Sequence, residues 1–422
     1  MPLSRHFYSL DEVQSALYYS TNRNIPQETL FWSQELILSG CIGENISIQF
    51  ESWLWNKGPL QLQWLINAWT NLASNELSED MILLSTYQLC STSYTHRDHS
   101  LWNILVLSAS NSNIPDRVTP KTPYILPSND EQEIFFIRAI FQGKSQSAWW
   151  ISRYFKDSHV WILLDWYAKN IFPNYYKQYK ICFEALQHYE QLLGYKSDEY
   201  DIIVRCLAIL SLCLSPEKQV HSFKELDSVL NSHYIELLEN ISSSIGYKSR
   251  RIYIIPTECL YGTTLRGRSK WSQQNTFQLN NIEKHLIGCP FWDETLNDYI
   301  NLVDDNGNII WKSDDDMEIF YDKYFPDDIP DEWSKIEKQK SHGDGILGPN
   351  DSPNILKYSR TYLSKNTLMA WNTTGDVNHF LEKCGELLNE CILSKISTLL
   401  KSPIPFNKNI LKPVHRRPYF II

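Results

Sequence analysis

The stretch EQEIFFIRAIFQGKSQSAWWISRYF, residues 131–155, decides the fold class. Its apolar residues recur at spacings of three and four, the period of a helix with one buried face. Gly143 interrupts the pattern and Ser145 restarts it, so the stretch predicts two short helices joined by a tight turn. The same signature recurs from residue 10 to about residue 235 without strand-like alternation. The chain is therefore expected to be mainly α-helical.

These helical segments are short, and brief connections between them favour antiparallel neighbours. Pro26 is placed to begin a helix that Gly40 ends, and Gly58 with Pro59 separates two further helices. Helix pairs recur at intervals of about 30–45 residues, a spacing typical of helical repeats. For residues 1–240 this pattern leaves two architectures open. One is a helical-hairpin stack of the HEAT or tetratricopeptide kind, and the other is a compact all-α domain.

The pattern changes near residue 250. Residues 245–345 predict a smaller mixed α/β region, in which NLVDDNGNIIW forms a hairpin with Asn306 and Gly307 at its turn. Ser313 is placed to cap a following helix that opens with three aspartates. Residues 346–422 predict a loop, a terminal helix and a basic tail broken by prolines. We expect three parts: 1–240, 245–345 and 346–422.

The acidity of the chain is concentrated in one segment. The net charge is −10, yet fifteen acids and only three lysines lie between Asp293 and Glu337. The rest of the chain is therefore close to neutral. An acidic segment of this kind steers basic partners and sets their orientation.

A candidate protein-binding surface lies within that acidic segment. Three apolar residues spaced four apart would align into one stripe if Pro330 allows a helical turn: Phe325, Ile329 and Trp333. Four acids would form its rim: Asp327, Asp328, Asp331 and Glu332. Such a stripe is typical of an anchor for a basic partner. Trp333 could equally pack this helix against its own domain.

A candidate nucleic-acid surface precedes it. Six cations are interleaved with aromatic residues, a pattern typical of single-strand binders, in which cations follow phosphates and rings stack on bases. The cations are Lys248, Arg250, Arg251, Arg266, Arg268 and Lys270. A solvated basic loop, or an internal partner for the acidic segment, would explain the same cluster.

Three strings imitate catalytic motifs without their context. HRDHSLWNILV, residues 96–106, matches a kinase catalytic loop, but no glycine-rich loop, strand lysine or DFG accompanies it. Gly143-Lys144-Ser145 lacks the first glycine of a phosphate-binding loop, and GDGILG at 343–348 follows a charged helix and meets Pro349. Cysteines and histidines at 90–99 and 285–289 provide too few ligands for structural zinc. We expect no catalytic residue, no cofactor and no metal.

Other features of the sequence restrict the location of the protein in the cell and the class of protein to which it belongs. No apolar run reaches the length of about 20 residues that a membrane span needs. The first residues carry no apolar signal region. Nine cysteines without C-x-x-C pairs are typical of a reducing compartment. These features predict a soluble, cytoplasmic protein that contacts no membrane.

The first residues also carry a resemblance. SRHFYSLDEVQSALYYS and the F-W-x-x-E-L pattern at Phe31, Trp32, Glu35 and Leu36 resemble uncharacterised α-helical proteins of nucleocytoplasmic large DNA viruses. The resemblance covers roughly residues 1–75. It implies a viral, intracellular origin and transfers no catalytic residue.

The sequence thus favours a non-enzymatic helical scaffold or adaptor that binds other proteins in a multi-subunit complex. A second hypothesis is a subunit of a viral gene-expression complex, in transcription or translation initiation, that binds RNA or single-stranded nucleic acid. An enzyme whose site is assembled from scattered residues is the weakest of the three.

Overall fold

The computed structural model describes residues 2–6, 8, 10–22, 24–74, 78–91, 117–196, 198–213, 223, 228–245, 282–304 and 308–324. Within these residues the chain is mainly helical, with one two-stranded antiparallel sheet near residue 300. The predicted fold class, mainly α with a smaller mixed region, is confirmed. The described residues form two compact units, and the boundary between them falls within the helix α3 (Ile42–Ser52).

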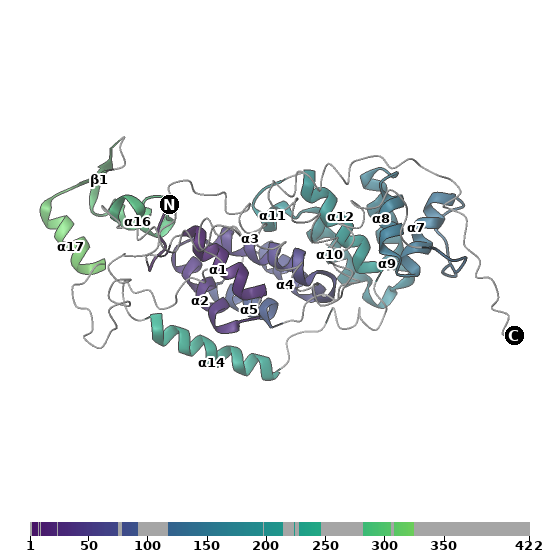
Figure 1. Cartoon of the computed structure of the whole chain (residues 1–422), viewed down its shortest axis with the longest axis horizontal. Helices are drawn as coiled ribbons and strands as arrows, with labels where there is room; N and C mark the ends of the chain where they lie inside the picture. The colour runs from purple at the N-terminus through teal and green to yellow at the C-terminus, as the bar shows by residue number, and fades with distance from the viewer. Residues whose placement is uncertain are drawn as a thin grey trace, which may run out of the picture. The chain divides into compact units, whose positions relative to one another are not determined.

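Unit 1 contains the described parts of Met1–Gln49, Ser78–Ser91 and Leu226–Ser359. Its helical part comprises α1 (Leu10–Asn22), α2 (Pro26–Leu38), α5 (Glu79–Cys90) and α14 (Ser228–Ile245). α2 is the central helix, because α1, α5 and α14 all pack against it (Figure 1). Pro26 occupies the first turn of α2 and Gly40 follows its end with a positive φ of 75°, as the sequence predicts.

The mixed region of unit 1 consists of α16 (Pro290–Asn297), β1 (Ile300–Val303), β2 (Ile309–Trp311) and α17 (Asp314–Tyr324). β1 and β2 form the predicted hairpin, in which Leu302 faces Ile310 across the strands. The predicted cap of α17 is also present: the Asp316 backbone N–H donates to Ser313 Oγ at 3.1 Å. Near the other end of the chain, the Leu3 N–H donates to the His285 carbonyl at 2.6 Å.

Unit 2 contains the described parts of Phe50–Leu77 and Thr92–Glu225. Its longer helices are α4 (Leu62–Ala73), α7 (Glu131–Phe141), α8 (Ser145–Ser152), α9 (Asp157–Ile171), α10 (Tyr176–Gln187) and α12 (Asp198–Leu212), with α11 (Glu190–Leu193) as a single turn. α4, α9 and α12 all pack against α10. α10 therefore contacts a helix more than a hundred residues earlier. A strict repeat array would contact only its neighbours, so this unit matches the compact alternative better.

Two predicted helix breaks are present in unit 2. The π-helical turn Trp53–Lys57 and the 3-10 turn Gly58–Gln61 separate α3 from α4, with Gly58 at a φ of 46°. Gly143, at a φ of 68°, ends α7 just before α8 begins. Gly143-Lys144-Ser145 is therefore a helix–helix turn, which confirms its interpretation from sequence. The expected division into 1–240, 245–345 and 346–422 stays a prediction. Residues 240–245 belong to α14, and residues 246–281 and 325–422 lie outside the described residues.

Candidate functional site

The residues singled out in the sequence as binding sites lie outside the described ranges. All of the candidate protein-binding residues lie at 325–333 and all of the candidate nucleic-acid-binding residues at 248–270. The structure does describe the first part of the acidic segment, residues 293–304 and 308–324. It also describes surroundings that the sequence did not mark. Candidate sites are built from these residues.

The outer face of the β1–β2 hairpin is apolar and exposed. Leu302 and Ile310 are direct cross-strand partners, and 52% and 44% of their surfaces are accessible to solvent. Trp311, next along β2, points to the opposite face and packs on Phe320 and Tyr321 of α17. Alternation along a strand places Ile310 away from that packing. We call Leu302 and Ile310 the hairpin surface.

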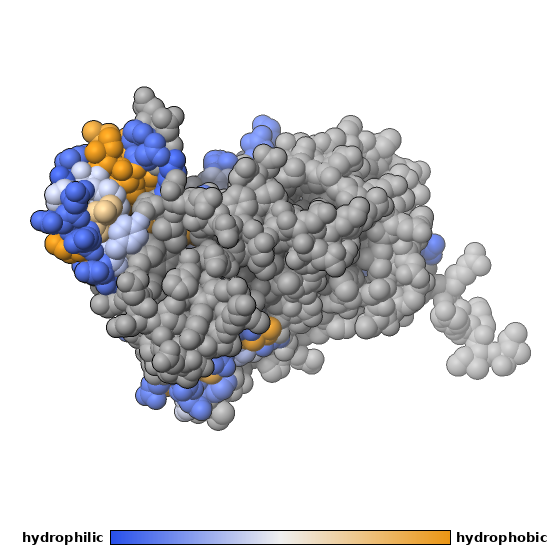
Figure 2. Space-filling model, turned by 60° about the vertical axis from the view of Figure 1, so that its left-hand side comes forward, coloured by the Kyte–Doolittle hydropathy of each residue, from blue (hydrophilic) through white to orange (hydrophobic). Residues whose placement is uncertain are grey.

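Carboxylates are abundant around the hairpin surface. The described part of the acidic segment contains nine: Asp293, Glu294, Asp298, Asp304, Asp314, Asp315, Asp316, Glu318 and Asp322. Figure 2 shows hydrophobic side chains (orange) beside hydrophilic ones (blue) in this part of the molecule, at the left of the view. On α17 the exposed Ile319 has Asp315 and Asp322 as its helix neighbours at i−4 and i+3. Apolar and anionic side chains therefore alternate over this surface.

The two described lysines of this segment do not neutralise it. Lys312 Nζ donates to the carbonyl oxygens of Asn297 and Asp298, at 3.0 and 2.6 Å, and so caps the end of α16. Lys323 Nζ lies 5.0 Å from the centre of the Tyr324 ring. Within the described ranges, neither Asp314 nor Asp315 forms an ion pair. The hairpin surface therefore lies in a field of negative charge.

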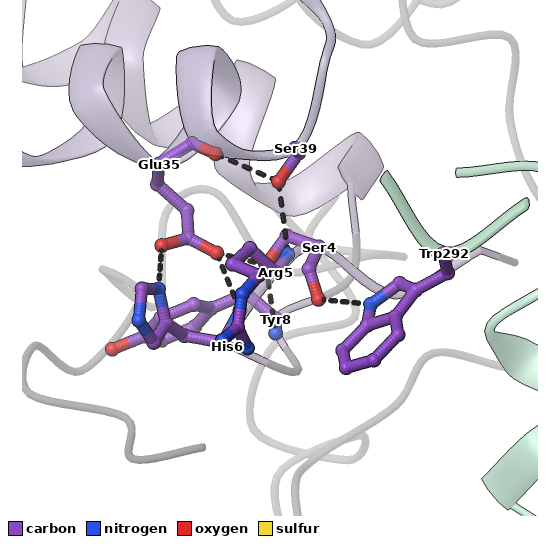
Figure 3. A network of polar contacts seen from close by, with 7 residues as sticks. All are labelled: Ser4, Arg5, His6, Tyr8, Glu35, Ser39 and Trp292. Carbon is purple, nitrogen blue, oxygen red and sulfur yellow. Dashed lines mark hydrogen bonds and ion pairs between the residues drawn. The ribbon is translucent and has the colours of Figure 1, made fainter. Parts of the chain in front are cut away.

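A buried network holds the mixed region against α2. Glu35 of α2, 1% exposed, accepts hydrogen bonds from Ser4 Oγ at 2.5 Å and from the His6 backbone N–H at 2.8 Å. His6 Nδ1 lies 2.5 Å from its second carboxylate oxygen. Figure 3 shows Glu35 reaching from α2 to the backbone of residues 4–6. This carboxylate thus fastens the first residues of the chain to α2.

The same first residues also bind α16 and α17. The Ser4 carbonyl accepts a hydrogen bond of 2.9 Å from Trp292 Nε1 (Figure 3). The guanidinium of Arg5 lies 4.6 Å from the ring centre of Phe291, 5.5 Å from that of Trp292 and 5.6 Å from that of Tyr324. Cation–π contacts of this kind strengthen when water is excluded. Residues 4–6 therefore connect α2 with the two helices that carry the hairpin.

The electrostatics of the network favour an ionised Glu35. Burial by itself raises the pKa of Glu35, but the electrostatic interaction with His6 and the hydrogen bonds from His6 and Ser4 lower it below its usual value. Burial also lowers the pKa of Arg5, which Glu35 partly offsets. A serine–histidine–acid triad would need the serine to bond to the histidine. Here Ser4 and His6 both point at the carboxylate, and all three side chains are buried. The arrangement holds residues 4–6 against α2.

Unit 2 exposes a second apolar surface. In the segment before α7, Tyr124, Ile125 and Leu126 are all exposed, and 84% of the Tyr124 surface is accessible. The segment is nevertheless held in place. Gln142 accepts from the Thr119 N–H and donates to the carbonyls of Thr119 and Lys121, at 2.7–2.9 Å. We call Tyr124, Ile125 and Leu126 the loop surface.

The cysteines are packing residues in this structure. Six cysteines of the described residues are buried and form no disulfide: Cys41, Cys90, Cys182, Cys206, Cys213 and Cys289. Cys41 and Cys289 both donate to the Ser39 carbonyl, at 3.7 and 3.5 Å.

No three histidine, cysteine or acidic side chains gather as metal ligands in the described ranges. Over the same ranges, none of the helices combines the length and apolar character needed to cross a membrane.

Sequence reasoning missed both the loop surface and the network. Three consecutive large apolar residues between Pro123 and Pro127 could have marked the former. The network offers no such signal, because Ser4, His6 and Glu35 are ordinary polar residues until the fold brings them together.

Searches of protein-family models, curated proteins and solved structures found no match to the chain.

Proposed function

We propose that the chain is a non-enzymatic adaptor that binds other proteins through two separate surfaces. The observation that carries the proposal is that each unit holds its own exposed apolar surface on a hydrogen-bonded framework. In unit 1 this is the hairpin surface, and in unit 2 it is the loop surface. Exposed apolar area costs about 25 cal/mol per Å² relative to burial, which favours covering it by a partner.

The geometry at both surfaces supports binding rather than chemistry. Neither surface contains a histidine, cysteine or paired carboxylate that burial has tuned, the feature that marks many catalytic groups. In unit 1, Glu35, Cys41 and Cys289 have shifted pKa values, and all three are buried side chains that hold the network and its surroundings together. The buried thiols of the described cysteines, none of them in a disulfide, also support the expected location in a reducing, cytoplasmic compartment.

The experiment is affinity purification of the full chain from cells of its native source, in three forms. These are the natural sequence, Leu302→Ser/Ile310→Ser and Tyr124→Ser/Leu126→Ser, each with and without nuclease. Circular dichroism and thermal melting establish that the two variants fold as the natural chain does. Both replace exposed residues, and Tyr124→Ser also removes the hydrogen bond from the Tyr124 hydroxyl to the Asn170 carbonyl.

If the chain is such an adaptor, each variant should lose the partners that bind its altered surface and keep the others. Nuclease treatment should change neither set of partners. Two results would contradict it. Either both variants keep every partner, or nuclease releases the partners. The second result would favour the nucleic-acid-associated subunit that the basic cluster suggests.

A further inference from the structure

We propose that the hairpin surface binds a lysine- or arginine-rich segment of a partner protein in which bulky apolar residues lie among the cations. The inference rests on the adaptor function and names the partner class for one of its two surfaces. It follows from three features of the described residues: the exposed apolar pair, the carboxylates along the chain on either side of it, and the presence of only two lysines against nine acids in this segment.

The apolar pair provides the contact. Leu302 and Ile310 face each other across the hairpin, so their side chains lie about 4.5–5.5 Å apart at Cβ and form one continuous patch. A single bulky apolar side chain of a partner can cover both. The patch is fixed in position, because Trp311 anchors the reverse side of the hairpin on α17. Little ordering cost is therefore expected when a partner binds.

The carboxylates select the partner's charge. Asp298 and Asp304 flank Leu302 along the chain, and Asp314 and Asp315 follow Ile310 within five residues. A partner side chain seated on the patch has its own neighbours within the negative potential of these carboxylates, which extends over roughly one Debye length, about 8–10 Å. Cations at those positions gain attraction, whereas anions meet repulsion of equal size. The phosphates of a nucleic acid are disfavoured for the same reason.

A second copy of the chain is disfavoured as the occupant. A two-fold contact between two hairpin surfaces would place each patch against itself. The acids of one copy, among them Asp314 and Asp315, would then face the acids of the other. Lys312 and Lys323 offset only part of this repulsion, because the described part of the segment has two lysines against nine carboxylates. The partner is therefore a different, basic segment.

The test uses the full chain and three fluorescein-labelled synthetic peptides, with binding measured by fluorescence anisotropy. The first peptide alternates lysine and isoleucine, the second carries glutamate for lysine, and the third carries serine for isoleucine. Two chain variants address the site: Leu302→Ser/Ile310→Ser removes the patch, and Asp314→Asn/Asp315→Asn removes charge.

Each site variant has a matched control elsewhere. Tyr124→Ser/Leu126→Ser removes exposed apolar residues from the loop surface. Glu79→Gln/Asp80→Asn removes two exposed acids from the first turn of α5, as Asp314 and Asp315 are exposed acids in the first turn of α17. Because each control makes the same kind of change as its site variant, large exposed side chains to serine or exposed acids to amides, a difference between them reports the location of binding.

The expected result is that only the lysine–isoleucine peptide binds, and that each site variant weakens it about tenfold, while neither control does. Added salt should weaken binding to the natural chain more than to Asp314→Asn/Asp315→Asn. Equal binding by all four variants would overturn the inference, as would tighter binding of a single-stranded oligonucleotide. Zero-length cross-links from Asp314 or Asp315 to a lysine of the same chain would also overturn it, in favour of an internal occupant. If the peptide fails to bind but Leu302→Ser/Ile310→Ser still loses partners on purification, the adaptor function is supported and the inference of a cationic partner is rejected.

Discussion

Replacing Glu35 by alanine should release the first residues of the chain from α2. The substitution removes the acceptor of three polar contacts, from Ser4 Oγ, the His6 N–H and His6 Nδ1. Breaking a buried ion pair by deleting one partner costs about 3–5 kcal/mol, because the remaining groups stay buried without their partner. Glu35→Gln keeps the shape and one acceptor, so we expect a smaller loss of about 2 kcal/mol.

Two measurements check this prediction. Thermal unfolding of the full chain should show the transition of unit 1 lowered by roughly 10 °C for Glu35→Ala, given about 2–4 °C per kcal/mol for a unit of this size. Hydrogen exchange should show lost protection in residues 2–6 and in α16, but not in α10 of unit 2. A loss below about 1 kcal/mol, well under the range expected for a broken buried pair, or unchanged exchange in residues 2–6, would refute the fastening role of Glu35.

The fastening should also depend on pH with a defined sign. The folded chain holds the pKa of Glu35 below its usual 4.5, so folding favours the ionised carboxylate. Its stabilisation is complete above pH 4.5 and is lost as the pH falls through the folded pKa. The stability difference between the natural chain and Glu35→Gln should therefore shrink in acid. Glu28→Gln on the same helix is the control: burial raises the pKa of Glu28, so its replacement should not destabilise the chain at neutral pH.

Further predictions concern packing around this network. Trp292→Ala should lower the free energy of unfolding by about 3–5 kcal/mol and increase hydrogen exchange in α16 and α17. Trp292→Phe should lower it by about 1 kcal/mol, since mainly the hydrogen bond to the Ser4 carbonyl is lost. Urea unfolding distinguishes the two variants. Gly40→Ala should destabilise more than Gly194→Ala in the same assay: both residues have positive φ, but only at Gly40 would a Cβ lie 2.9 Å from Pro290. Burial raises the pKa of Cys289 to about 11 and that of Cys41 to about 12, so neither thiol should be alkylated at pH 8 until the chain unfolds. Rapid alkylation of the folded chain, followed by peptide mass spectrometry, would contradict that expectation.

The helices could be predicted wherever a long apolar face repeats. Residues 131–143 and 145–155 were predicted as helices, and α7 and α8 occupy 131–141 and 145–152. The start of α3 at Ile42 gives no comparable signal. Its buried face contains Asn45, whose side chain donates to the Ser33 carbonyl at 3.0 Å. A polar residue satisfied inside the core breaks the periodic signal that sequence reasoning depends on.

The candidate sites could be predicted only in part. Acid excess is a property of composition, so the negative character of residues 293–337 was visible in the sequence. The exposure of Leu302 and Ile310 was not, because alternation gives a hairpin two faces and does not say which one is covered. α16 is only eight residues long, too short for a periodic pattern, and its packing depends on residues 4–6, nearly three hundred positions away.

The adaptor function is tested most directly by hydroxyl-radical footprinting of the chain in its native complex, compared with the purified chain alone. Leu302, Ile310 and Tyr124 should be oxidised readily in the purified chain and several-fold less in the complex. Ile235 of α14, 51% exposed and outside both surfaces, should be labelled equally in both samples. Equal labelling of Leu302, Ile310 and Tyr124 in the two samples would contradict the proposal that partners cover the hairpin and loop surfaces.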